Sequence, residues 1–588
     1  MSLLARLSET VGDAFEAAGV DRSYGTVVVS KRPDLGQFQC TGALAAARSV
    51  GRNPREIAQT VINALTATEM FAAVSIAGPG FINLTLTDAA ITAVTQAAVD
   101  DERCGCTLVE RPVRYIVDFG GPTVAKAMHV GHLRSTIIGD SLQRLLRFLG
   151  HDVTSDIHMG DWGTQMGMLI IEVERRYPDL PYFDASFSGP YPTESPVTLD
   201  DLHEMYPTVA ARVAEDEAEA ERARRATTEL QNGRPGYRAL WQHFANVSIS
   251  AQRADFEALG VKFDLWYGES TVHDRIAPLL ERIKSSGRAV ISDGALVVPV
   301  AEEGDQMDIP PMLLTKSDGS YLYTTTDLAT LDQRITELKA EDILYVVDAR
   351  QALHFIQVFR AARLTGIVPD DVALEHIAFG TMNGTNGKPF KTREGGVLKL
   401  KDLIAMVTDA ALARLAEARI AESYPDEERA AIAKAVGLAA LKFGDLSNHR
   451  TSNYVFDLDR FSSFEGKTGP YLLYGAVRIR SILRKAAEHA FLPGPITDPA
   501  TDVERDLMLF LARLPDSLAR AAELRAPNHI AEFAYDLTTR FNRFYEQCHI
   551  LSEQDPKRRG SWLSLVAVTL RELILTLDLL GISVPERM

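Results

Sequence analysis

Two histidines and a glycine, His129, Gly131 and His132, are the residues of this sequence best suited to chemistry on a phosphate ester. They follow the apolar segment Val113 to Val117, which is typical of a buried strand, and they precede apolar residues at helical spacing. The two imidazoles therefore share one face of the first turn of a helix, at its positive end, where glycine lets a ligand approach the backbone. Such a site binds nucleotide phosphates and stabilises charge that develops during attack on them, so we predict chemistry on ATP.

A strand–helix–strand unit must hold this motif. Gly150 is expected to end the helix as a left-handed cap, and the apolar segment 153–157 predicts the next strand. Open α/β sheets bind their ligands at the carboxyl ends of the strands, which is where the motif lies. Ordinary helix capping would explain the same residues in isolation, so the prediction depends on this surrounding βαβ unit.

The run His129-Val130-Gly131-His132 resembles the HIGH signature of class I aminoacyl-tRNA synthetases. Segments 125–140, 160–165 and 321–327 resemble arginyl-tRNA synthetases in particular. So do Asp348-Ala349-Arg350-Gln351, Gly387-Lys388-Pro389-Phe390-Lys391-Thr392-Arg393 and the terminal Val584-Pro585-Glu586-Arg587-Met588. These blocks follow the order of that family across nearly the whole chain. The resemblance implies an arginine–tRNA ligase, which joins L-arginine to tRNA-Arg through an arginyl-adenylate and uses ATP with Mg²⁺.

The expected fold class is multidomain α/β. We expect an N-terminal α+β domain over 1–110, a Rossmann-like parallel-sheet catalytic domain over 111–396 and an all-α helix bundle over 397–588. Residues 175–245 interrupt the βα pattern with a Pro/Ser/Gly-rich stretch and a charged helix, which predicts an exposed, mobile insertion. The resemblance implies that the first domain contacts tRNA and that the last binds the anticodon.

Local signals support these domains. Asn53-Pro54-Arg55-Glu56 is a good helix start, and 81–86 alternates with the period of a strand. Ile530, Phe533, Leu537, Phe541 and Phe544 fall at helical spacing, which predicts a buried helix in the bundle.

Composition narrows the class of protein. The 588 residues suffice for two to four domains, and no apolar run approaches the ~20 residues that cross a bilayer. Four cysteines exclude a disulfide framework, and no secretory signal precedes the first domain, so we expect a cytoplasmic monomer without a structural metal. The net charge of −17 does not exclude tRNA, because RNA interacts with the local surface within about 10 Å.

The guanidinium of arginine is a planar, always-charged fork of donors, so its pocket needs carboxylates. Asp118 ends the first strand, and Asp327 lies four residues after Tyr323, on the same helix face. The resemblance implies that these three residues bind arginine, together with Gly121, Thr123, His132 and Gln351. Where the family has Ser-Pro-Asn, this chain has Gly121-Pro122-Thr123. The side-chain amide of the family's Asn is therefore replaced by the single hydroxyl of Thr123.

The resemblance also implies the residues that act on ATP. Catalytic residues are expected to be His129, His132, Lys126 and Lys391, and the ATP-binding residues His129, Gly131, His132, Lys388, Lys391 and Arg393. The loop with Lys388 and Lys391 replaces the usual second signature of the class, and Lys126 occupies the place of a compensating lysine. Basic side chains beside the leaving pyrophosphate suit this chemistry. No protein ligand for a metal is predicted.

Two other functions fit parts of the pattern. Gly121 and Thr123 suit a paralogue that activates arginine or an analogue for an acceptor other than tRNA. A non-catalytic RNA-binding protein could retain the fold alone, but His129, His132 and Lys126 argue against it.

Overall fold

The computed structural model describes residues 2–66, 68–317, 321–384, 387 and 398–588. This part of the chain groups into two compact units. The sheet unit comprises 110–414 and 444–461, and the bundle unit comprises 1–109, 415–443 and 462–588. No described helix is both long and apolar enough to cross a membrane.

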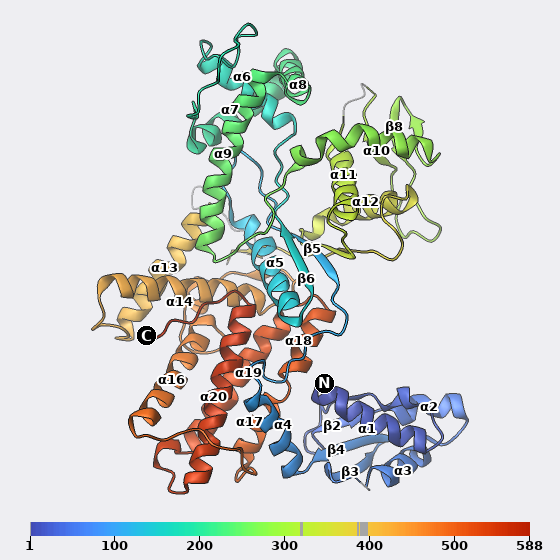
Figure 1. Cartoon of the computed structure of the whole chain (residues 1–588), viewed down its shortest axis with the longest axis vertical. Coiled ribbons are helices and arrows are strands. Elements are labelled where there is room, and N and C mark those ends of the chain that lie inside the picture. The colour runs from blue at the N-terminus through green and yellow to red at the C-terminus, as the bar shows by residue number, and fades with distance from the viewer. Residues whose placement is uncertain (1, 67, 318–320, 385–386, 388–397) are drawn as a thin grey trace. The chain divides into compact units, whose positions relative to one another are not determined.

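A four-stranded parallel sheet organises the sheet unit, and Figure 1 labels its strands β5 and β6. Its strand order is β11-β10-β5-β6, with bounds β5 Arg114–Asp118, β6 Asp152–Asp156, β10 Asp342–Tyr345 and β11 Ala373–His376. Tyr345 pairs in register with Asp118, and Asp118 pairs with Asp156. Register partners in adjacent strands point to the same face, so these three polar residues form one row at the carboxyl end of the sheet.

Helix α5 (Val130–Leu149) connects β5 to β6 and lies beside them in Figure 1. It begins after His129 and ends at Gly150, whose φ of +98° is the left-handed conformation predicted for a glycine cap. The predicted βαβ unit is therefore confirmed, with the histidine motif at the carboxyl end of its first strand.

Four helices follow β6 and gather in one group in Figure 1. They are α6 (Thr164–Arg176), α7 (Leu199–Glu215), α8 (Glu217–Gln231) and α9 (Pro235–Ala258). Their inner faces bury a hydrophobic cluster that includes Leu202, Met205 and Leu230 and extends to Val124 and Ala125, just before the histidine motif. We predicted that this insertion is exposed, and for the inner face of its helices the prediction is wrong. The charges that dominate the sequence of α8 lie only on the outer side of that helix.

The second half of the sheet unit adds further elements around the sheet. In chain order they are α10 (His273–Ser285), β7 (Val290–Ser292), β8 (Ala295–Val298), β9 (Met312–Thr315), α11 (Tyr323–Thr336), α12 (Ala352–Leu364), β12 (Met382–Asn383), α13 (Leu400–Glu417), β13 (Tyr454–Val455) and α15 (Leu458–Phe461). Strands β7, β8 and β9 form an antiparallel sheet of their own. Helix α11 and the strand β10 that follows it share a buried core with α10 and α12.

The N-terminal part of the bundle unit is α+β, as predicted. Its antiparallel sheet has the order β1-β2-β4-β3. The elements are α1 (Leu3–Ala17), β1 (Val27–Val29), β2 (Phe38–Cys40), α2 (Gly42–Val50), α3 (Pro54–Leu65), β3 (Phe71–Ala77), β4 (Phe81–Leu86) and α4 (Asp88–Asp100). Asn53 caps α3 by accepting the Arg55 N–H at 2.9 Å, so the predicted helix start is confirmed.

The remainder of the bundle unit is helical. It contains α14 (Asp426–Leu446, whose last turn belongs to the sheet unit), α16 (Gly469–Glu488), α17 (Asp502–Leu511), α18 (Leu514–Glu523), α19 (Asn528–Gln547) and α20 (Pro556–Leu579). The apolar stripe predicted on α19 is buried from Ile530 to Phe544. The multidomain α/β class is therefore confirmed, while the three predicted domain boundaries stay a prediction.

Candidate active site

The histidine motif forms the cap of α5. The Nδ1 atom of His129 accepts the Gly131 N–H at 3.0 Å, and the Nδ1 atom of His132 accepts the His129 N–H at 3.1 Å. Because both Nδ1 atoms accept, the proton of each neutral ring is on Nε2. The capping interpretation and the catalytic interpretation are thus compatible, since capping occupies Nδ1 and leaves an N–H donor at Nε2.

Both imidazoles are held in the neutral form. Burial, together with the charges of His129 and Lys126, lowers the pKa of His132 to about 4, although the hydrogen bond from the His129 backbone opposes this shift. Burial, followed by the charge of Lys126, also lowers the pKa of His129. The ring centroids are 4.1 Å apart, so the two donors form a compact pair at the positive end of the helix.

Lys126 is positioned by the inserted helices. Its ammonium lies 4.5 Å from the centroid of the Tyr206 ring on α7, in cation–π geometry. Burial lowers the pKa of this lysine. Three other basic residues are predicted to bind ATP: Lys388, Lys391 and Arg393. They lie outside the described residues.

A cavity of about 470 Å³ lies in the sheet unit. Two residues predicted to bind arginine, Thr123 and Tyr323, both line it. Thr123 is placed by a bridge to Gly160 and by its carbonyl, which accepts the Gln252 side chain at 3.0 Å. Gly121 has a φ of +37° with open space where a side chain would be. Its positive φ suits glycine at this turn.

Asp327 lies one turn after Tyr323 on α11, as predicted from their spacing. Its carboxylate pairs with His354 Nε2 at 2.8 Å, and the His354 ring lies 5.2 Å from that of Tyr323. Gln351 is exposed at the end of the short 3-10 turn Ala349–Gln351 after β10.

Glu269 is a carboxylate of this cavity that its local sequence does not mark as functional. It lies in a 3-10 turn, where no periodic pattern marks it, and it lines the cavity. Burial raises its pKa to about 7, and the charges of Asp161 and Asp327 act in the same direction. His158 and a backbone hydrogen bond from Trp162 oppose them. A buried carboxyl with a raised pKa in a cavity is a candidate functional residue, and a cationic ligand would stabilise its ionised form.

Asp118 already has a cation as its partner. Arg334 on α11 donates from Nη2 to Asp118 at 2.6 Å and to Asp156 at 2.7 Å. Burial raises the pKa of Asp118, although Arg334 opposes this. His158 completes the one group of three possible metal ligands found among the described residues, but an internal guanidinium occupies its two carboxylates.

The structure brings several predicted residues to one region. Burial raises the pKa of the Tyr345 phenol and Arg334 opposes this, while the charges of both Asp118 and Asp327 act in the same direction as burial. Thr123, Tyr323 and Glu269 share the cavity. Among the described residues, His129 and His132 lie outside the lining of this cavity, so the prediction that ATP and arginine share one crevice stays a prediction.

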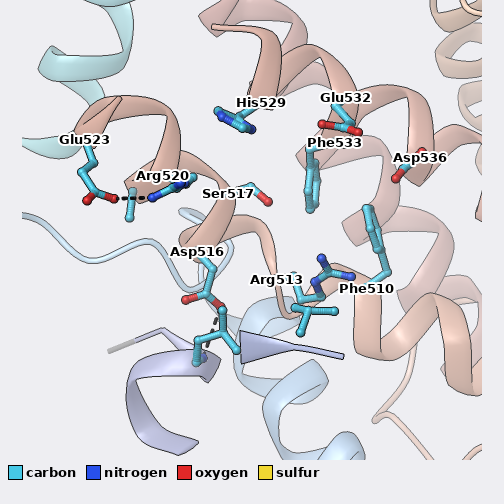
Figure 2. A pocket seen from close by; sticks show the side chains of 13 residues that line it. Phe510, Arg513, Asp516, Ser517, Arg520, Glu523, His529, Glu532, Phe533 and Asp536 are labelled. Atoms are coloured by element: carbon cyan, nitrogen blue, oxygen red, sulfur yellow. Dashed lines mark hydrogen bonds and ion pairs between the residues drawn. The ribbon is translucent and has the colours of Figure 1, made fainter. Parts of the chain in front are cut away.

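A second cavity, of about 650 Å³, lies in the bundle unit (Figure 2). It is bounded by α17, α18 and α19 and by Leu4 and Val29 of the N-terminal part. Several of its charged groups already have partners, since Asp516 accepts the Leu4 N–H at 3.2 Å and Arg520 pairs with Glu523 at 3.1 Å. The cavity therefore lies where the N-terminal part meets helices α17, α18 and α19.

Comparison with known proteins identifies the family. Residues 93–458 match the model described as "tRNA synthetases class I (R), catalytic domain", residues 472–588 match the "DALR anticodon binding domain", and residues 2–86 match the "Arginyl tRNA synthetase N terminal domain". The chain is 50% identical to "Arginine--tRNA ligase" of Hyphomonas neptunium and 48% identical to that of Alkaliphilus oremlandii, with all of each chain covered.

Solved structures agree. The arginyl-tRNA synthetase of Plasmodium falciparum superposes with a TM-score of 0.82 at 25% identity, covering 100% of this chain and 99% of that one. The resemblance stated from the motifs is confirmed, and nothing in these comparisons supports the paralogue or the non-catalytic alternative. The chain belongs to the arginyl-tRNA synthetase family of class I aminoacyl-tRNA synthetases.

Proposed function

We propose that this chain uses ATP to join L-arginine to tRNA-Arg, through an arginyl-adenylate. The observation that supports this most directly is Glu269, which lines a cavity together with Tyr323 and Thr123. The charge of Asp327 acts on this carboxylate, so the two acidic residues lie near one another. Together with the Nε2 donors of the histidine pair, they offer a socket for a guanidinium and donors for a phosphate. We infer the reaction from family membership, and these side chains explain how arginine and ATP could bind.

In the first step, the carboxylate of arginine attacks the α-phosphate of ATP and pyrophosphate leaves. His129 and His132 donate Nε2–H to the phosphate oxygens as their negative charge increases in the transition state. Lys126, with Lys388, Lys391 and Arg393, neutralises the pyrophosphate. In the second step, a ribose hydroxyl at the end of tRNA attacks the adenylate carbonyl and AMP leaves. Catalysis consists of positioning and electrostatics, without a covalent enzyme intermediate.

In this proposal the guanidinium of arginine binds Asp327 and Glu269, with the Tyr323 phenol beside them. The sequence predicted that Asp118 would also bind this guanidinium. We do not assign Asp118 to it, because its carboxylate already pairs with Arg334. Thr123 replaces the amide that the family uses and, with Gly121 and Gln351, is assigned to the backbone end of the amino acid.

The partners follow from the same chemistry. We propose that Mg²⁺ arrives bound to ATP, since Arg334 already pairs with both carboxylates of the three-ligand group described above. All four cysteines are free and buried, which suits the reducing cytoplasm, and we propose that the protein acts there as a monomer.

Aminoacylation of total tRNA with each of the twenty amino acids tests the proposed function. We expect charging with arginine alone, and only of tRNA-Arg. Adenylate formation without transfer to tRNA would instead support the paralogue, and the absence of pyrophosphate exchange even with tRNA present would support the non-catalytic alternative.

The raised pKa of Glu269 predicts a pH-dependent KM for arginine. A cationic ligand binds the ionised carboxylate, so below about pH 7 it must displace a proton, and the KM rises by up to about tenfold per pH unit as pH falls. Above that pH the KM is level. The kcat at saturating arginine stays constant down to about pH 6, because the pKa of His132 lies at about 4.

Charging assays between about pH 5.5 and 8.5 measure both parameters. Glu269→Gln is expected to raise the KM at pH 8 and to remove its slope below pH 7. Glu302→Gln, which changes an exposed glutamate paired with Arg360, is the matched control. A wild-type KM that does not change with pH contradicts the assignment of Glu269.

A further inference from the structure

Arg334 ties helix α11 to three strands of the parallel sheet at once. It is 1% exposed, and its Nη2 atom donates to Asp118 on β5 and to Asp156 on β6. Its guanidinium also lies 5.2 Å from the centroid of the Tyr345 ring on β10. These three residues are the register row at the carboxyl end of the sheet, so one side chain covers the whole row.

The same helix presents the arginine-binding residues. Asp327 lies seven residues before Arg334 and Tyr323 eleven residues before it, and at 3.6 residues per turn all three fall on one stripe of α11. Fixing Arg334 to the sheet therefore fixes the rotation of α11 that turns Tyr323 and Asp327 toward the substrate. Because α11 is continuous from Tyr323 to Thr336, no flexible segment separates Arg334 from Tyr323 and Asp327.

Arg334 also determines which carboxylates remain for a ligand. Asp118 and Asp156 are buried, and without a cation they would offer a guanidinium a second site at the strand ends. With Arg334 in place, that site is filled by a guanidinium of the protein itself. Glu269 and Asp327 then remain for the guanidinium of the substrate, although the Asp327 carboxylate also pairs with His354.

We propose that Arg334 is a positioning and specificity-determining residue for arginine. It acts through Asp118, Asp156 and the orientation of α11, and it does not touch the substrate. This inference rests on the proposed function, because it assigns the substrate guanidinium to Asp327 and Glu269.

Kinetics of tRNA charging test the proposal. In Arg334→Lys a single ammonium replaces the planar fork and cannot serve both carboxylates equally well. We expect the KM for arginine to rise at least tenfold, while the KM for ATP changes less than twofold. Arg275→Met is the matched control, because Arg275 also holds α11 by an ion pair, to Asp332 at 2.9 Å, but from α10. We expect it to leave the KM for arginine unchanged.

Chemical rescue separates positioning from a general loss of structure. In Arg334→Ala, millimolar guanidinium ion can enter the vacated space between Asp118 and Asp156, and we expect it to raise kcat/KM for arginine at least threefold. In the wild type the same ion can only compete with arginine, so it should leave kcat/KM unchanged or lower it. An increase in Arg334→Ala without an increase in the wild type supports the proposal, and inhibition of both proteins contradicts it.

Folding of each variant is followed by circular dichroism and thermal melting. If the single variants do not fold because two buried carboxylates lose their cation, Asp118→Asn, Asp156→Asn and Arg334→Met are combined to remove all three charges. This neutral protein should fold and still show the raised KM for arginine. A folded Arg334→Lys or neutral variant with a KM within twofold of the wild type overturns the inference. Failure of the wild type to charge tRNA with arginine overturns the proposed function instead.

Discussion

Replacing His132 by alanine should slow formation of the arginyl-adenylate by about two to three orders of magnitude. The variant loses a neutral Nε2–H donor directed at the charge that develops on the α-phosphate, and the loss of one such preorganised donor has this size. A single-turnover measurement with enzyme, ATP, arginine and tRNA reports the step directly. An unchanged rate would refute the catalytic role of His132.

The capping bond of His132 needs a separate control, since alanine also removes the acceptor for the His129 N–H. Loss of a cap destabilises a helix by about 1 kcal/mol and could lower activity indirectly. Thr198→Ala removes a comparable capping box, formed with Asp201, from α7 in the same unit. We expect it to lower the melting temperature slightly and to leave the rate unchanged. His132→Asn, which keeps an acceptor and a donor, should recover part of the rate.

Replacing Asp327 by asparagine should raise the KM for arginine about 30-fold to several thousand-fold. The change preserves shape and removes one charge from a charge pair with the substrate, for which losses of about 2–5 kcal/mol are typical. The KM for ATP should stay within about twofold, because the carboxylate is assigned to the amino acid alone. Steady-state charging with varied arginine and varied ATP measures the two constants.

Asp332→Asn is the matched control for this variant. Asp332 lies on the same helix but pairs with Arg275 and Arg282, so it loses a charge of equal size without facing the substrate. We expect its KM for arginine to stay close to that of the wild type. An increase of less than about threefold in Asp327→Asn, or an equal increase in both variants, would remove Asp327 from the arginine pocket.

Local signals in the sequence predicted the elements that position the site. The strand before His129, the glycine cap at Gly150 and the helical spacing of Tyr323 and Asp327 are all confirmed. Each of these features depends on neighbours within a few residues: backbone preference, capping and periodic burial. Such short-range effects are readable without a fold.

The partners of the carboxylates were not readable in this way. Arg334 lies 216 residues from Asp118, and nothing in its local sequence distinguishes it from a surface arginine on a helix. Glu269 owes its raised pKa to burial by distant segments, and the composition around it is ordinary. The insertion was misjudged for a related reason, since the charges of α8 dominate its sequence while its buried face is shared with residues near Val124.

The row formed by Tyr345, Asp118 and Asp156 restricts the lengths of three strands as well as their residues. Side chains alternate along a strand, so deleting or inserting one residue within β5, β6 or β10 would turn its member of the row to the opposite face. The loops that follow these strands face no such constraint. Among relatives of this protein, we therefore expect gaps in aligned sequences to fall after these three positions and rarely before them within the strands.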